Sequence, residues 1–324
     1  MEFRKLGSLW PVSRLTLGGG GIGQVWGNTS PEEAVATVRE AADAGINLLD
    51  LAPSYGRGEA ERVVGTAFQG RLPEGLRIGT KFQLGNPSPE QVSDRINASL
   101  DRSLEALRVE HVDLLFLHSN LIPDTYRYPM EGQDRFATTW RIFEDCVRPA
   151  LEALIAQGRI GAWGITGVGL PDTVIHALNE TPRPAVVQAV ANLMDSPGGM
   201  RRYPEEARPR EIIAAAAQHD VGVLGIRAVQ AGALTAGFDR SLPRDHPDMR
   251  DYRIAAPFRE FAATEGFDPA VLAHRYALSM AGIDSVVLGV KNRQELQQCL
   301  DAEAAGPLDE DLVERIDALG LREE

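Results

Sequence analysis

In the segment Ile46-Asn47-Leu48-Leu49-Asp50-Leu51-Ala52-Pro53-Ser54-Tyr55-Gly56, a short apolar run ends in a carboxylate and a turn. Similar apolar segments recur along the chain, and longer segments with helical periodicity lie between them. The expected strands are Arg14–Leu17, Ile46–Leu49, Leu76–Thr80, Val112–Leu117, Ile160–Ile165, Ala185–Ala189, Gly222–Ile226 and Ser285–Leu288. Alternating strand and helix units with continuous apolar strands predict a parallel sheet covered by helices.

The number of strand–helix units favours a closed barrel over the alternative, an open doubly wound sheet. No break in composition marks a second domain, so we predict an α/β fold, a (β/α)8 TIM barrel, as one domain over residues 1–324. Segments 3–6 and 9–12, on either side of Gly7, predict a short N-terminal β-hairpin that caps the barrel floor. Ser119–Ala137 and Thr235–Arg250 are too long for simple connections, and we expect them to be lids or binding loops.

Helix starts are marked by a repeated device. Ser30-Pro31-Glu32-Glu33 reads as an N-cap, a proline at the first helical position and a capping-box glutamate. Ser88-Pro89-Glu90-Gln91 repeats the pattern, and Leu308-Asp309-Glu310-Asp311 does so more weakly. We therefore predict helices that begin at Pro31 and Pro89.

Composition excludes several classes of function. The 324 residues carry 33 basic and 46 acidic side chains, a net charge of −13, which argues against nucleic-acid or anionic-membrane partners. Two cysteines make no disulfide framework, and no Cys/His cluster has the spacing of metal ligands. The first residues lack the apolar core of a signal peptide, and no run approaches the roughly 20 apolar residues of a membrane span. We expect a soluble, cytoplasmic protein with no metal.

One glycine-rich motif invites a different interpretation. Gly18-Gly19-Gly20-Gly21-Ile22-Gly23 satisfies the dinucleotide pattern G-x-G-x-x-G and follows an expected strand. In a Rossmann site, however, the last glycine opens a helix whose N-terminus holds the pyrophosphate. Here the next helix is expected only at Pro31, so the Rossmann interpretation is disfavoured. We expect the glycines to let a ligand approach the barrel rim closely.

Ionisable residues gather where three successive expected strands end. Asp50, Lys81 and His118 end the second, third and fourth strands, and Tyr55 lies in the turn just beyond Asp50. The carboxyl ends of parallel barrel strands share one face, which is where barrel active sites lie. We therefore expect these four side chains to meet at the barrel mouth.

The four residue types suggest proton delivery to a carbonyl oxygen. A phenol is a weak acid with a pKa near 10, and a neighbouring ammonium is expected to lower that pKa by stabilising the phenolate. A buried ammonium in turn stays charged if a carboxylate holds it. Asp50, Lys81 and Tyr55 thus form a plausible chain, with His118 orienting the carbonyl. No side chain donates hydride, so the partner reagent must be a cofactor.

At these residues the sequence resembles the aldo-keto reductases, and the resemblance extends over nearly the whole chain. It rests on residues 47–56 with Glu61 and Gly65, on Gly79-Thr80-Lys81, and on Asp113-Leu114-Leu115-Phe116-Leu117-His118. The resemblance implies an NADP(H)-dependent oxidoreductase. It further implies that Tyr55 is the general acid/base, Lys81 tunes it, Asp50 holds Lys81 and His118 positions the substrate.

The resemblance also implies a set of cofactor-binding residues. They are Thr166, Gln188, Arg227, Gly289, Lys291, Arg293 and Gln298. Thr166 and Gln188 match the positions that hold the nicotinamide amide, and Lys291 matches the cation at the adenosine 2′-phosphate, with Arg293 assisting. The chain departs from the family at Gly167, Ile226 and Cys299. Ile226 stands where the family usually stacks a tyrosine on the nicotinamide, and Arg227 follows it.

Two functions remain open from the sequence. The first is reduction of an aldehyde or ketone, or oxidation of an alcohol or sugar lactol in reverse, on a small-molecule substrate. Trp26 and Phe82 are candidate walls of the substrate pocket. The second is a regulatory or sensor module that binds NADP(H) with little turnover, as in the channel-associated β-subunits of the same family.

Overall fold

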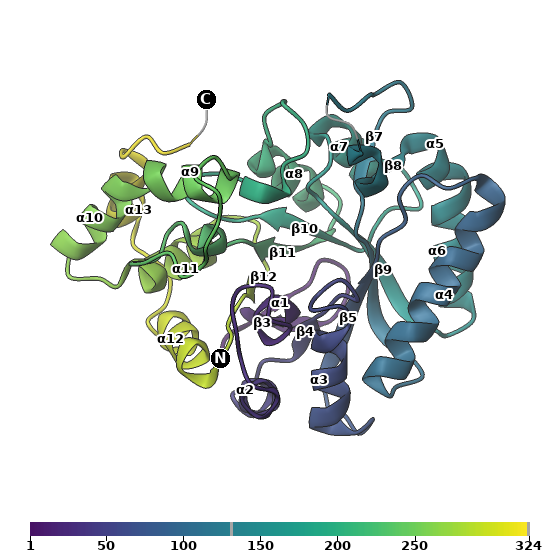
Figure 1. Ribbon diagram of the computed structural model, residues 1–324, viewed down its shortest axis with the longest axis horizontal. Helices are drawn as coiled ribbons and strands as arrows, with labels where there is room; N and C mark the ends of the chain where they lie inside the picture. Colours follow the sequence, from purple (N-terminus) through teal and green to yellow (C-terminus); the bar gives the residue numbers. More distant parts are fainter. Residues whose placement is uncertain (130–131, 323–324) are drawn as a thin grey trace.

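A closed parallel barrel forms the centre of the molecule in the computed structural model, which describes residues 1–129 and 132–322 (Figure 1). Each barrel strand pairs with the next along the chain, and the last pairs with the first. The strands are β3 (Leu15–Gly18), β4 (Leu48–Asp50), β5 (Arg77–Phe82), β6 (Val112–Leu117), β9 (Ile160–Thr166), β10 (Val186–Val190), β11 (Gly222–Ile226) and β12 (Ser285–Leu288). The predicted barrel is confirmed, and the open sheet is excluded.

Helices surround the barrel, as Figure 1 shows. The main covering helices are α2 (Pro31–Asp43), α3 (Glu59–Phe68), α4 (Pro89–Leu107), α6 (Arg148–Ala156), α7 (Pro171–Asn179), α8 (Pro209–Ala217), α11 (Pro269–Ser279) and α12 (Arg293–Ala304). Further helices are α1 (Gly19–Ile22), α5 (Trp140–Ile142), α9 (Pro247–Ile254), α10 (Ala256–Thr264) and α13 (Glu310–Asp317). Single turns η1 (Gln133–Phe136), η2 (Phe143–Val147), η3 (Gly198–Met200) and η4 (Gln230–Gly232) lie in the connections.

Two helix starts fall at the predicted prolines, but their caps differ. The Ser30 hydroxyl accepts a hydrogen bond from the backbone N–H of Glu33, whereas the side chain of Ser88 caps no backbone N–H. The Glu33 carboxylate does not complete a capping box, because it binds Arg293 of α12 instead. The sequence pattern located both helices without distinguishing their caps.

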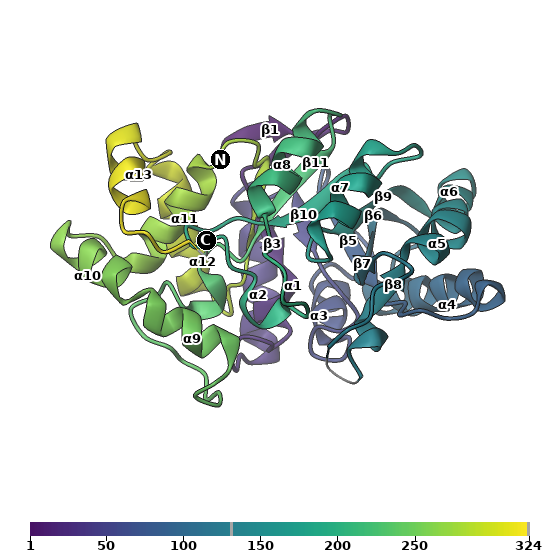
Figure 2. The ribbon, with the colours of Figure 1, turned by 90° about the horizontal axis from the view of Figure 1, so that it is seen from above.

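The predicted hairpin closes the barrel floor. Strands β1 (Phe3–Lys5) and β2 (Pro11–Ser13) pair antiparallel. Leu6 and Val12 are fully buried in one cluster with barrel residues such as Leu48, Phe116 and Leu224. Figure 2 shows β1 at one end of the barrel, while α1, β7 (Asn120–Ile122), β8 (Ala137–Thr139) and α9 lie at the opposite end. The mouth and the floor are therefore separate regions.

The glycine run forms close packing rather than an open turn. Residues 19–22 make the single helical turn α1, which the sequence did not predict. A Cβ at Gly21 would lie 1.9 Å from the carbonyl oxygen of Val290, and one at Gly20 would lie 2.3 Å from Nε1 of Trp26. Glycine is therefore required because the chain after β12 and the Trp26 ring approach this closely. Gly18 and Gly20 also line the main cavity, so the expected close approach to a ligand stays a prediction.

Candidate active site

The four residues singled out at the strand ends meet at the barrel mouth. Asp50 is the last residue of β4, Lys81 lies in β5, and His118 directly follows β6. The ammonium of Lys81 donates hydrogen bonds of 2.8 Å to Oδ1 of Asp50 and 2.8 Å to the carbonyl oxygen of Leu51. The same Nζ lies 4.9 Å from the centroid of the Tyr55 ring. The Tyr55 and His118 rings meet edge to face, with centroids 6.0 Å apart.

Burial and charge set the protonation of this group. Burial lowers the pKa of Lys81, but Asp50 and Tyr55 outweigh it, so that the Lys81 pKa rises above its ordinary value. This shift favours the charged ammonium form of the buried Lys81 side chain. Burial lowers the pKa of His118 to about 3, and Lys81 adds to the shift, so its imidazole is neutral at physiological pH.

The pKa of Tyr55 moves in the opposite direction to our expectation. Burial raises it above the ordinary value, and the opposing effect of Lys81 does not reverse the shift. The expectation considered the ammonium alone and neglected desolvation of the phenolate, which is the larger effect here. Tyr55 is consequently a protonated phenol at neutral pH, ready to donate a proton.

Gln188 and Thr166 flank the group from the neighbouring strands β10 and β9. Nε2 of Gln188 donates a 2.7 Å hydrogen bond to Oδ1 of Asp50, so Asp50 serves both Gln188 and Lys81. The hydroxyl of Thr166 donates to the carbonyl oxygen of Leu117 at 3.1 Å. Both side chains are buried and both line the cavity described next.

A cavity of about 420 Å³ opens above these residues, within the range of small-molecule and cofactor sites. Of the predicted residues, those that line it are Trp26, Asp50, Tyr55, His118, Thr166, Gln188, Arg227, Gly289, Lys291 and Gln298. One cavity thus joins the residues of the β4–β6 strand ends to the segment that follows β12. An elongated ligand that carries both a reactive ring and a distant polar group would fit this donor set.

Three predicted site residues do not line the cavity: Lys81, which is buried against the Tyr55 ring, and two that lie elsewhere. Phe82 is 1% exposed and belongs to the core between barrel and helices. Side chains alternate along a strand, and because Lys81 faces the mouth, Phe82 must face outwards. Arg293 does not line the cavity; its guanidinium and its backbone N–H bind the carboxylate of Glu33 in α2. We therefore remove Phe82 from the substrate pocket and Arg293 from the cavity wall.

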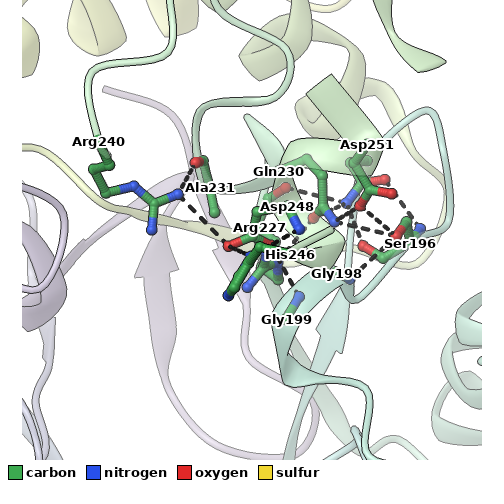
Figure 3. A network of polar contacts seen from close by, with 11 residues as sticks. Ser196, Gly198, Gly199, Arg227, Gln230, Ala231, Arg240, His246, Asp248 and Asp251 are labelled. Carbon is green, nitrogen blue, oxygen red and sulfur yellow. Dashed lines mark hydrogen bonds and ion pairs between the residues drawn. The ribbon is translucent and has the colours of Figure 1, made fainter. Parts of the chain in front are cut away.

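Arg227 lines the cavity but is not a free cation. Its guanidinium donates 2.6 Å to Oδ1 of Asp248 and 2.8 Å to Oε1 of Gln230 (Figure 3). Gln230 donates in turn to Asp251 at 2.5 Å. Burial lowers the pKa of Arg227, and Asp248 opposes that shift. This network joins the end of β11 to α9 and fixes the cavity wall between them.

The sequence analysis missed several cavity residues. They are Asp239, Arg240, Asp268, His274 and Glu295. Asp239 and Arg240 lie in the long segment 235–250, where length alone predicted a binding loop without naming a side chain. Glu295 lies in the first turn of α12, whereas Lys291 precedes the helix, so their contact depends on the conformation of the loop before Asn292 and did not follow from spacing.

In residues 1–129 and 132–322, no three His, Cys, Asp or Glu side chains come together as candidate metal ligands. No helix described by the structure is long and apolar enough to cross a membrane.

Comparison with known proteins defines the class of protein. The model of the Aldo/keto reductase family matches residues 14–320, so the chain belongs to the aldo/keto reductase family. It is accordingly an oxidoreductase with a (β/α)8 barrel, from a family that generally uses a nicotinamide cofactor. An aldo-keto reductase from Bacillus halodurans, solved in its holo form, superposes with a TM-score of 0.73 at 23% identity. The match covers 98% of this chain and 96% of that one, and it supports the fold.

Two curated relatives are similar to the chain over most of its length. It is 25% identical to the L-galactose dehydrogenase of Arabidopsis thaliana, over 100% of this chain and 92% of the relative. It is 26% identical to a D-threo-aldose 1-dehydrogenase of a Pseudomonas species, over 89% of this chain and 88% of that protein. Both relatives are named for the oxidation of sugars.

Proposed function

We propose that this protein interconverts a carbonyl compound and its alcohol, with Tyr55 as the general acid and base. The observation that carries the proposal is the buried Asp50–Lys81 ion pair beneath the Tyr55 ring, with the neutral His118 imidazole beside it. A buried ion pair adds little net stability, because desolvation of the two charges offsets their attraction. Stability alone therefore does not explain why this pair is present. The group does suit proton transfer at the mouth of a cavity.

Each side chain then has a distinct role. In the reducing direction the Tyr55 phenol donates its proton to the carbonyl oxygen, and the resulting phenolate is stabilised by the Lys81 ammonium. Asp50 keeps Lys81 charged, and His118, being neutral, donates a hydrogen bond that orients the same oxygen. A bound reduced nicotinamide supplies the hydride that the carbonyl carbon requires. In the oxidising direction the phenolate removes the proton from the alcohol.

The cavity lining supports a nicotinamide dinucleotide as the cofactor. We assign Thr166 and Gln188 to the nicotinamide amide, and Gly289, Lys291 and Gln298 to the adenosine half. The resemblance of Lys291 to the cation at the family's 2′-phosphate predicts NADP(H). Arg227 is assigned to the wall of the cavity, where Asp248 neutralises it.

For the substrate we propose an aldehyde, a ketone or an aldose oxidised at its anomeric carbon. The two sugar dehydrogenases among the relatives support the sugar class. Trp26 offers an aromatic wall at the cavity, which suits the apolar face of a sugar ring.

Absorbance of the reduced nicotinamide at 340 nm, a general property of that group, tests the proposal. The protein is mixed with NADPH or NADH and a panel of aldehydes, and with NADP⁺ or NAD⁺ and a panel of aldoses. Turnover on at least one pair is expected. Tight cofactor binding without turnover on any carbonyl or sugar would instead favour the regulatory or sensor module. Absence of any cofactor binding would overturn both.

A further inference from the structure

The segment around Lys291 shows how the cavity would discriminate between the two nicotinamide dinucleotides, provided the proposed function is right. NADP(H) differs from NAD(H) by a 2′-phosphate on the adenosine ribose. A phosphate group of this kind carries nearly two negative charges at neutral pH. To hold it, a site needs cations or backbone N–H groups that are free to receive it.

Lys291 is already held by two carboxylates. Its ammonium donates a short hydrogen bond to Oδ2 of Asp239, and it lies 3.1 Å from Oε1 of Glu295. Its side chain is only 18% exposed. Burial lowers the pKa of Lys291, but Asp239 and Glu295 outweigh burial and raise it. The three side chains thus place two carboxylates around one ammonium.

The backbone N–H groups at the start of α12 are also taken. The N–H of Lys291 donates 2.8 Å to Oε2 of Glu295, and that of Arg293 donates 2.9 Å to Oε1 of Glu33. The N–H of Glu295 donates 2.9 Å to Oδ1 of Asn292. The anion-binding end of this helix therefore already holds carboxylates from the chain itself.

The remaining cavity cations offer no substitute. Arg227 is bonded to Asp248, and Arg240 is bonded to the carbonyl oxygen of Ala231 and lies 3.6 Å from Oδ2 of Asp248. Among the residues that line the described cavity, every arginine and lysine thus has a carboxylate within ion-pair distance.

We propose that the protein prefers NAD(H) to NADP(H), and that Glu295 and Asp239 are the residues that determine this specificity. A 2′-phosphate would meet two carboxylates around a single ammonium. Ribose hydroxyls, in contrast, donate hydrogen bonds to carboxylates, which is how acidic residues select NAD in other dinucleotide sites. This inference replaces the NADP(H) preference that the family resemblance predicts from Lys291.

Direct binding measurements test the proposal without any substrate. NADH and NADPH are titrated into the protein by isothermal calorimetry at low and high salt, and quenching of tryptophan fluorescence gives a second readout, since Trp26 lines the cavity. We expect NADH to bind at least roughly tenfold more tightly than NADPH, the scale of one charge-assisted contact. Equal or tighter NADPH binding would overturn the specificity while leaving the proposed function standing. Failure of both to bind would contradict the proposed function itself.

Substitutions at Glu295 and Asp239 test whether these residues determine the cofactor preference. Glu295→Gln, alone and with Asp239→Asn, should tighten NADPH binding several-fold and weaken NADH binding, because Lys291 is released to the phosphate while the ribose loses its acceptors. Asp301→Asn is the matched control, because Asp301 lies on the same helix, does not line the cavity, and its carboxylate accepts a hydrogen bond from Gln297. It removes the same charge and should leave the ratio of the two affinities unchanged. Thermal melts confirm that each variant is folded. A ratio that moves equally in Asp301→Asn would reduce the effect to net charge and overturn the assignment.

Discussion

Asp50 shows how one side chain can organise an active site. Its Oδ1 atom accepts both from the Lys81 ammonium and from Gln188. It thereby joins the proton-transfer group to a residue we assign to the cofactor. Strand β4 supplies it from the barrel wall, where its backbone is held in register with Gly79 of β5. Single substitutions in this group should therefore affect different properties, such as turnover in one case and the free energy of unfolding in another.

Tyr55→Phe removes the proton donor and little else. We expect turnover to fall by about 10²–10⁴-fold, the usual contribution of a general acid, while cofactor affinity stays within about twofold. Steady-state rates and a cofactor titration measure the two effects separately. Tyr252→Phe, on α9, serves as the control and should keep full turnover. An active Tyr55→Phe enzyme would exclude the assigned role.

The raised pKa of Tyr55 predicts opposite pH behaviour for the two directions. The phenol is the form that reduction needs, and because the pKa lies above its ordinary value of 10, the phenol is fully present across the neutral range. Reduction should therefore be level from pH 6 to 9, whereas oxidation, which needs the phenolate, should rise steadily with pH. His118 is neutral throughout this range, so its ionisation adds no second transition to the pH profile of the rate. An oxidation rate that levels off near pH 7 would show that bound cofactor reverses the shift.

Removing one member of the buried ion pair should cost more than removing both. Lys81→Met leaves the Asp50 carboxylate buried with only Gln188 and is expected to lower the free energy of unfolding by about 3–5 kcal/mol. Lys81→Met with Asp50→Asn leaves no unpaired charge, and should recover part of that loss. Chemical denaturation of the three proteins provides the comparison. A double variant no more stable than Lys81→Met would mean that the two side chains do not interact as the geometry indicates.

At the scale of the element, the helix starts show where sequence patterns stop being informative. Ser30 and Ser88 stand in the same Ser-Pro-Glu context, and the prolines correctly located both helices. Only the structure distinguishes their hydroxyls: that of Ser30 accepts from the backbone N–H of Glu33, whereas that of Ser88 bonds the carboxylate of Glu90. Glu33 is drawn away by Arg293 from a helix 260 residues further along. Interactions across such a separation leave no local signature.

These two serines give a paired prediction. Ser30→Ala removes an observed cap on the N–H of Glu33 and should lower the free energy of unfolding by about 1 kcal/mol. Ser88→Ala removes no such bond and should cost clearly less. Urea unfolding of both variants measures the difference. Equal losses would mean that the cap on Ser30 contributes nothing to stability.

Local sequence patterns also explain which site residues could be predicted from the sequence and which could not. Asp50, Lys81 and His118 were accessible because strand order and the shared face of a parallel barrel follow from local apolar patterns. Phe82 was wrongly predicted to line the pocket, because the alternation of side chains along β5 was not taken into account. Lys81 points inwards, so the next residue points outwards. Arg227 was found, but its partner Asp248 comes from a helix beyond a long loop, so the neutralisation of its charge was not predictable.

At the scale of the whole molecule, the floor and the mouth of the barrel carry separate tasks. Leu6 of the hairpin region is completely buried in the inner cluster of the floor and does not line the cavity. Leu6→Ala should therefore cost about 2–5 kcal/mol in stability, as for other buried leucines. Turnover measured well below the melting temperature should not change.

Phe3 provides the matched comparison, because it lies in the same hairpin but is 48% exposed. Phe3→Ala should alter the melting temperature far less than Leu6→Ala. Calorimetric melting with parallel rate measurements separates the two regions. A Leu6→Ala enzyme with impaired turnover at low temperature would show that the floor and the mouth are coupled.

The seam between β3 and β12 has a consequence for synthesis. The first barrel strand pairs with the last, and the packing of Gly21 against Val290 joins the cavity wall across that seam. A nascent polypeptide therefore exposes an unpaired edge on β3 until translation has passed residue 290, and during that time the cavity at the barrel mouth is incomplete. Any ligand of this cavity can therefore stabilise the fold only after synthesis of the last strand, because it contacts both the first and the last segments of the barrel.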